Sequence, residues 1–120
     1  MYGIEVNVNK LLLDEHPLII LPNLACRVGL EEAVILQQVH YWLNKSNHLI
    51  NERKWVYKTY EEWHAEFPFW SIPTIRRKIT GLEKDKILIT ANFNKMLIDR
   101  TKWYSIDYRN LSRYDKRVKE

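Results

Sequence analysis

Basic residues recur along residues 71–84 at a spacing that suits contact with a polyanion. On a helix turning about 100° per residue, Arg77 and Lys84 lie opposite the apolar Ile75 and Ile79. An arginine can donate two parallel hydrogen bonds to a guanine edge or a phosphate, and a lysine can neutralise a phosphate. The outward residues of this predicted helix that could contact DNA are Thr74, Arg76, Arg77, Lys78 and Lys84.

A second group of cations lies between two runs rich in β-forming residues, 87–90 and 102–108. These runs predict an antiparallel hairpin with a long tip. Lys95, Arg100 and Lys102 are placed there to touch phosphates. Residues 96–98 (Met96, Leu97 and Ile98) are apolar, so we expect them to fold back onto the core. The alternative is a patch for a protein partner.

No combination of residues predicts catalysis, a metal site or a cofactor. The four histidines, at positions 16, 40, 48 and 64, lack metal-ligand spacing with one another or with the single cysteine. The three glycines are too far apart for a phosphate loop. Cys26 lies among apolar residues, which predicts a buried and inert thiol. His40 is expected to be a partly buried structural residue. We therefore expect a protein that is not an enzyme.

Two short helices joined by a tight turn must position the basic residues. Thr59 and Glu62 have the spacing of a capping box, which predicts a helix over residues 60–66. The aromatic–proline run 67–70 predicts a turn, and Ser71 then caps a helix over residues 72–84. A basic second helix after such a turn is how many proteins enter the DNA major groove.

The rest of the chain supplies the predicted core. An apolar helix over residues 30–43 follows a shorter helix over 23–28 that ends at Gly29. We expect residues 18–21 to be a buried strand or extended segment, and residues 53–58 to be a strand. Residues 44–51 are expected to be a polar loop, and residues 109–120 to fray.

The length and the charge of the chain limit the classes of protein to which it could belong. At 120 residues the chain is long enough for one domain. Its net charge of +4 is polarised: from residue 69 onward there are thirteen basic residues against six acidic ones. That asymmetry is typical of a polyanion partner. The single cysteine suits a reducing cytoplasm, and the chain shows neither a membrane span nor a signal peptide.

These features predict an α+β fold, a winged helix-turn-helix of three to four helices with a small antiparallel β-hairpin wing. Its expected organisation is an N-terminal arm (1–10), a winged-helix domain (11–111) and a charged C-terminal tail (112–120).

Several motifs also resemble the N-terminal domain of DnaD-like phage replication proteins. They are residues 11–22, 29–43, 55–63, 67–71, 74–77 and 99–104. The resemblance extends over residues 11–111. It implies a winged-helix fold used in replication initiation or helicase loading, in low-GC Gram-positive bacteria or their phages, with self-association through this domain.

The leading hypothesis is a duplex DNA-binding protein of phage or plasmid replication initiation. Thr74, Arg77 and Lys78 would then approach base edges, while Arg76 and Lys84 would contact phosphates. Lys95 and Arg100 would reach the flanking backbone or the minor groove. The alternatives are a transcriptional repressor and a protein-interaction or oligomerisation module, such as a small phage protein that inhibits a host or defence factor. The expected partners are double-stranded DNA, a second copy of the chain, and a replication or host protein.

Overall fold

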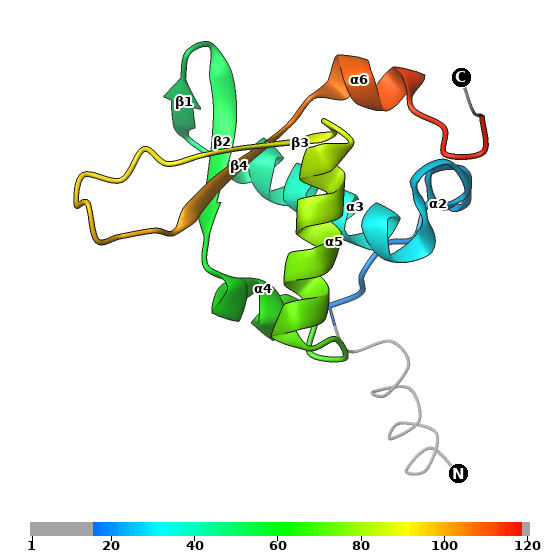
Figure 1. Ribbon diagram of the computed structural model, residues 1–120, viewed down its shortest axis with the longest axis horizontal. Helices are drawn as coiled ribbons and strands as arrows, with labels where there is room; N and C mark the ends of the chain where they lie inside the picture. The colour runs from blue at the N-terminus through cyan, green and yellow to red at the C-terminus, as the bar shows by residue number, and fades with distance from the viewer. Residues whose placement is uncertain (1–15, 119–120) are drawn as a thin grey trace, which may run out of the picture.

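The computed structural model describes residues 16–118, which form five helices and a four-stranded antiparallel sheet (Figure 1). The α+β class expected from the sequence is confirmed. The helices are α2 (Pro22–Val28), α3 (Leu30–Lys45), α4 (Tyr60–Glu66), α5 (Ile72–Lys84) and α6 (Tyr108–Arg113). The strands are β1 (His48–Ile50), β2 (Arg53–Lys58), β3 (Leu88–Ala91) and β4 (Lys102–Ile106).

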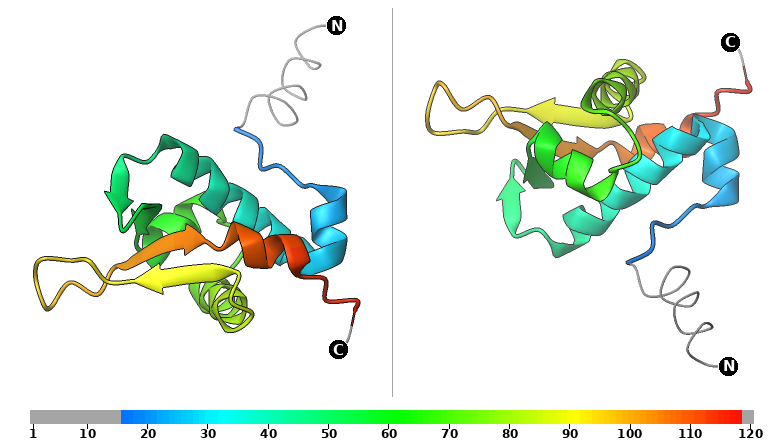
Figure 2. Two further views of the ribbon diagram at one scale, coloured as in Figure 1. Left: turned by 90° about the horizontal axis from the view of Figure 1, so that it is seen from above. Right: turned by 90° about the horizontal axis from the view of Figure 1, so that it is seen from below.

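The sheet has the order β1-β2-β4-β3, so the last strand in sequence lies between β2 and β3. Val56 pairs with Tyr104 across β2 and β4, and Thr90 pairs with Tyr104 across β3 and β4. The β3–β4 loop (residues 92–101) extends well beyond the sheet, as Figure 2 shows from two sides. In both of those views α5 is seen end-on beside β3.

Helix α3 occupies the centre of the molecule and contacts α2, α5, β2 and β4. Its predicted apolar surface is confirmed, because Ile35, Leu36 and Val39 are fully buried. Gly29 has a φ of 108°, a left-handed conformation that glycine adopts cheaply. It therefore ends α2 and separates it from α3, and the predicted helix end at this residue is confirmed.

Local capping signals define α4 and α5. Both hydrogen bonds of the predicted Thr59–Glu62 capping box are present, at 2.8 and 3.1 Å. The carboxylate of Glu66, at the end of α4, accepts hydrogen bonds from Gln38 and Trp42 of α3 and pairs with Lys58 of β2 at 2.7 Å. These contacts fix α4 against both α3 and the sheet, and the five residues 67–71 then lead into α5.

The expected polar loop over residues 44–51 is wrong in its second half. Residues 48–50 form β1, which pairs with β2 through a two-residue turn at Asn51 and Glu52. Both turn residues have positive φ, 54° and 63°, the conformation that matches the twist of a tight hairpin. Asn51 is the only local signal for this turn, because glutamate seldom adopts that conformation.

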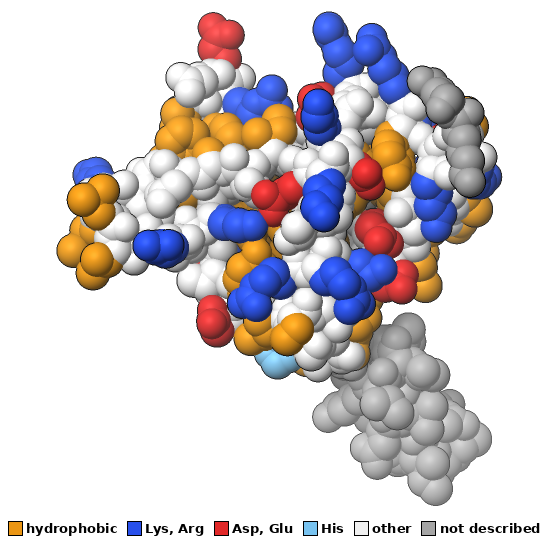
Figure 3. Space-filling model, viewed as in Figure 1, with side chains coloured by type: hydrophobic (Ala, Val, Ile, Leu, Met, Phe, Trp, Pro, Cys, Tyr) orange, Lys and Arg blue, Asp and Glu red, His pale blue; other side chains and the backbone are white. Residues whose placement is uncertain are grey.

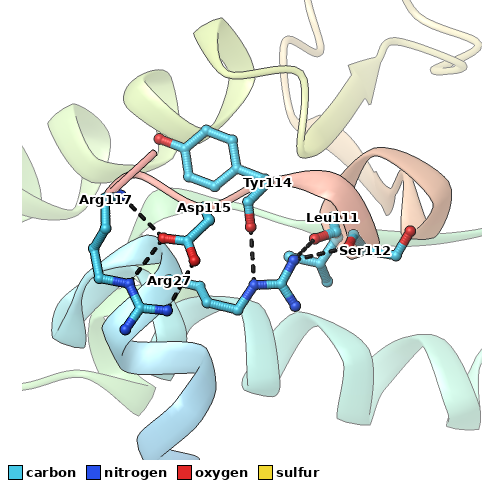
Figure 4. Close-up of polar contacts among 6 residues, drawn as sticks. All are labelled: Arg27, Leu111, Ser112, Tyr114, Asp115 and Arg117. Carbon is cyan, nitrogen blue, oxygen red and sulfur yellow. Dashed lines mark hydrogen bonds and ion pairs between the residues drawn. The ribbon is translucent and has the colours of Figure 1, made fainter. Parts of the chain in front are cut away.

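The expectation that residues 109–120 fray is wrong for their first part. Residues 108–113 form α6, whose first turn is capped by the Asp107 carboxylate accepting from the Asn110 N–H at 2.9 Å. The Arg27 guanidinium of α2 donates to the carbonyls of Leu111, Ser112 and Tyr114 at 2.8–3.0 Å (Figure 4). Arg27 therefore satisfies carbonyls that a helix end leaves unpaired.

Of the two forms expected for residues 18–21, the structure excludes the buried strand. Residues 18–21 are extended, but they are not a buried strand, because Ile19, Ile20 and Leu21 are 51%, 53% and 43% exposed. The predicted arm over residues 1–10 lies outside the described residues. Within residues 16–118 no helix is long and apolar enough to cross a lipid bilayer.

Candidate nucleic-acid interface

Helix α5 presents its cations on the side away from the core. Ser71 caps the helix by accepting from the Thr74 N–H at 3.3 Å, and Pro73 occupies the first turn, where proline is tolerated. Ile75 and Ile79 are fully buried, as the sequence predicted. The opposite surface carries Arg76, Arg77 and Lys84, which are all exposed and which we call the basic face of α5.

Two of the predicted contact residues are instead engaged by carboxylates. Lys78 pairs with Glu32 of α3 at 3.2 Å, and Lys102 pairs with Glu83 of α5 at 2.8 Å. Burial lowers the pKa of Lys102, but hydrogen bonds with Glu83 and Tyr60 more than offset it, so the net shift is upward. Lys102 therefore stays charged and holds the base of the β3–β4 loop against α5.

Thr74 is half-buried and belongs to the helix cap. Its hydroxyl oxygen accepts from the Ser71 hydroxyl at 3.0 Å. The side chain is therefore close to the turn that precedes α5, at the end of the helix that carries Arg76 and Arg77.

A groove of about 290 Å³ links the first turn of α4 to the base of the β3–β4 loop. Tyr60 lines it, and its ring lies 4.9 Å from the Arg76 guanidinium and 5.7 Å from the Lys102 ammonium. The exposed Glu61 and Arg100 line the same groove. The sequence predicted only that Tyr60 begins a helix, and no local pattern indicated its contacts with the two cations.

The β3–β4 loop exposes both its cations and its apolar residues. Lys95 and Arg100 are exposed. Met96, Leu97 and Ile98 are 63%, 98% and 83% exposed, so the expectation that they fold back onto the core is wrong. The loop extends away from the sheet, and no other element among residues 16–118 covers them.

A compact network holds the base of this loop. The Asn94 side-chain amide donates to the carbonyls of Asp99 and Thr101, both at 2.8 Å, and its oxygen accepts from the Trp103 indole at 2.7 Å. The Asp99 carboxylate accepts from the Thr101 N–H and from the Tyr57 hydroxyl, both at 3.0 Å. These bonds cross the loop from one side to the other, so its base is ordered.

Aromatic rings extend the network into the sheet. Phe93 packs edge-on against Trp55 and Trp103, with ring centroids 4.9 and 5.6 Å apart. His48 of β1 and Tyr57 of β2 both contact Trp103 at 5.1 Å. The loop therefore rests on side chains from β1, β2 and β4.

The surface seen in Figure 3 summarises this arrangement. Lys and Arg side chains gather over α5 and along the β3–β4 loop, and hydrophobic side chains cover the outer end of that loop. Of the ion pairs recorded within residues 16–118, none involves a member of the basic face of α5, Lys95 or Arg100. These five cations are free to meet an external anion.

Within residues 16–118 no three His, Cys, Asp or Glu side chains are grouped so as to hold a metal ion. Cys26 is exposed on α2, so its predicted burial is wrong. His40 is half-buried, and its Nδ1 lies 2.6 Å from the Tyr108 hydroxyl, which agrees with a structural role.

Comparisons of the chain with models of protein families, with characterised proteins and with solved structures found no match.

Proposed function

We propose that residues 16–118 form a winged-helix domain that binds duplex DNA, with α5 as the helix that enters the major groove. The order of elements supports this proposal: α4, a five-residue turn and α5 are followed by a β3–β4 hairpin, and β4 lies between β2 and β3. The β3–β4 loop is the wing of such a fold. This arrangement places a basic helix and a basic loop next to each other.

The observation that carries the proposal is the basic face of α5. Its three cations are exposed and outside the recorded ion pairs, while the opposite side of the helix is buried. Arg77 is the residue best suited to a guanine edge, a contact that discriminates by about 1–3 kcal/mol. Arg76 and Lys84 suit phosphates, which fix the position of the helix without selecting a sequence.

The β3–β4 loop extends this contact surface. Lys95 and Arg100 would meet the backbone or minor groove beside the site that α5 occupies. Lys78 and Lys102, which the sequence also suggests as contacts, would act mainly by bracing α5 against α3 and the loop. Thr74 would approach the DNA at the start of α5.

The resemblance to DnaD-like domains suggests the biological setting. We propose a role in phage or plasmid replication initiation, in which two or more copies bind adjacent sites. A dimer would double the length of DNA contacted by one α5 helix. Transcriptional repression would use the same surface.

Fluorescence anisotropy tests DNA binding. Labelled duplex of mixed sequence is titrated with the chain at about 50 mM and about 200 mM salt, where phosphate contacts differ strongly in strength. Arg76→Ala/Arg77→Ala should lose about tenfold or more in affinity. Arg109→Ala/Arg113→Ala removes the same charge from α6 and serves as the matched control.

Two results would contradict the proposal. One is the absence of binding by the unmodified chain at the lower salt concentration. The other is an equal loss in both double variants, which would mean that only net charge matters. Circular dichroism of each variant checks that the fold is retained.

A protein-interaction module is a second candidate function, because the exposed residues Met96, Leu97 and Ile98 would suit an apolar partner surface. If this function holds, replacing all three by Ser should change the oligomer size measured by light scattering while leaving DNA binding intact. An unchanged oligomer with unchanged DNA binding would exclude self-association through these residues.

A further inference from the structure

We propose that the apolar corner of the β3–β4 loop inserts between adjacent base pairs of duplex DNA and bends it. The corner consists of Met96, Leu97 and Ile98. This inference rests on the proposed function and adds to it a second kind of contact, made from the minor-groove side. Proteins that bend DNA use Leu, Ile, Met and Phe side chains as such wedges.

The corner has the shape that insertion requires. The Asp99 N–H donates to the Met96 carbonyl at 3.1 Å, which closes a four-residue turn with Leu97 and Ile98 at its two central positions. Leu97 is 98% exposed and Ile98 is 83% exposed. Two apolar side chains at the centre of this turn are therefore exposed to whatever approaches the end of the loop.

The corner also has a firm support. A wedge works only if its base resists being pushed back when bases separate. The Asn94 side chain, on the outgoing side of the loop, donates to the Asp99 and Thr101 carbonyls on the returning side, and the Trp103 indole fixes that side chain. The aromatic rings of Phe93 and Trp55 continue this support into the sheet. The base of the loop is therefore held in place, while the side chains at its corner are exposed.

The charges beside the corner favour DNA as the occupant. Lys95 precedes the apolar residues and Arg100 follows shortly after them, and both are exposed. An apolar tip with a cation on each side matches a base stack that has a phosphate backbone on each side. The basic face of α5 and the loop are visible on the same face of the molecule (Figure 3), so both could contact one duplex.

Insertion would also create sequence preference without hydrogen bonds to bases. Pyrimidine–purine steps such as TA unstack and kink most easily. The corner should therefore settle at such a step, at a fixed separation from the site that α5 occupies.

The experiment measures binding and base unstacking on the same DNA. A duplex of about 25 base pairs carries 2-aminopurine beside a central TA step and a fluorophore at each end. Saturation with the chain should raise 2-aminopurine fluorescence and increase energy transfer between the two ends. Leu97→Ser should abolish both signals and weaken binding by about tenfold, because the complex would lose the apolar side chain that insertion buries between base pairs. Leu49→Ser removes another exposed leucine, 67% exposed on β1, and should change neither signal.

The outcomes separate this inference from the proposed function. If the unmodified chain does not bind the duplex, both are overturned. If the chain binds but gives neither signal, or if Leu97→Ser leaves both signals unchanged, the wedge is overturned and DNA binding stands. If Leu97→Ser changes only the oligomer size in light scattering, the corner contacts a second copy of the chain and the wedge is again overturned.

Discussion

At the scale of single residues, Tyr60 connects the parts of the candidate interface. Its ring contacts both the Arg76 guanidinium of α5 and the Lys102 ammonium at the base of the β3–β4 loop. Cation–π contacts of this kind restrict where a long side chain can point. Tyr60 therefore orients Arg76 on the exposed side of α5, although Tyr60 itself is half-buried.

Glu61, the next residue, should weaken DNA binding. Its exposed carboxylate lines the same groove as Arg100 and Lys102. Glu61→Gln removes a charge that repels phosphate, and we expect affinity for duplex DNA to rise about threefold at about 50 mM salt. The gain should shrink at about 200 mM salt, where screening is stronger. Anisotropy titrations measure both.

Glu52→Gln is the control for this prediction. Glu52 is also exposed, but it lies in the turn between β1 and β2. A similar gain in both variants would show that the effect comes from net charge alone and would remove Glu61 from the interface.

At the scale of elements, the β3–β4 loop depends on strands that are distant in sequence. Tyr57 of β2 bonds to the Asp99 carboxylate, and His48 of β1 packs against Trp103. The short hairpin of β1 and β2 thus buttresses a loop that begins more than thirty residues later. Its contribution to the candidate site is support for the loop that carries Lys95 and Arg100.

The Asp99 contact predicts how the loop responds to acid. Hydrogen bonds from the Thr101 backbone and hydroxyl, and then from Tyr57, hold the pKa of Asp99 below its ordinary value of 3.8. The pKa of Asp99 is lowered in the folded state. The stabilisation from hydrogen bonds to its carboxylate is therefore fully present above the unfolded pKa, about 4, and is lost as the pH falls through the folded pKa. In an NMR titration the Thr101 amide resonance should stay constant from neutral pH to about pH 4 and shift only below it.

Asp99→Asn provides the comparison, because its side chain does not titrate in this range. A midpoint at or above 3.8 in the unmodified chain would show that the carboxylate is not held by these bonds in solution.

Local signals in the sequence predicted α3, α4, α5 and β2, because periodicity, capping residues and alternation act within a few residues. They did not predict β1 or α6. The end of α6 depends on Arg27, whose guanidinium reaches carbonyls 84 to 87 residues away. Such contacts leave no trace in a local pattern.

Sequence patterns likewise predicted some features of the candidate site and not others. The helical repeat correctly placed Arg76, Arg77 and Lys84 on the exposed side of α5. It could not show that Lys78 and Lys102 pair with Glu32 and Glu83, since those partners lie 46 and 19 residues away. Nor could it show that residues 96–98 are exposed, because that depends on how far the loop extends from the sheet.

At the scale of the whole molecule, the number of exposed cations on the candidate interface would set the salt dependence of the proposed DNA binding. Arg76, Arg77, Lys84, Lys95 and Arg100 are exposed and outside the recorded ion pairs. If each neutralises one phosphate, the logarithm of the binding constant should fall against the logarithm of salt concentration with a slope of about −4.5.

Anisotropy titrations across a salt series give this slope directly. A value near −6 would mean that Lys78 and Lys102 exchange their carboxylate partners for phosphates. A slope near zero would contradict an electrostatic interface altogether.

The bonds from Arg27 to the end of α6 have a consequence for folding. They join α2 to α6 and so close nearly the whole described chain into one ring, which the Lys116 N–H reinforces by donating to the Arg27 carbonyl at 2.8 Å. Closing so long a ring costs chain entropy before it gives any contact, so it should form after the folding barrier. Arg27→Met should then speed unfolding in stopped-flow measurements while leaving the refolding rate unchanged, which makes this junction a determinant of how long the native state lasts.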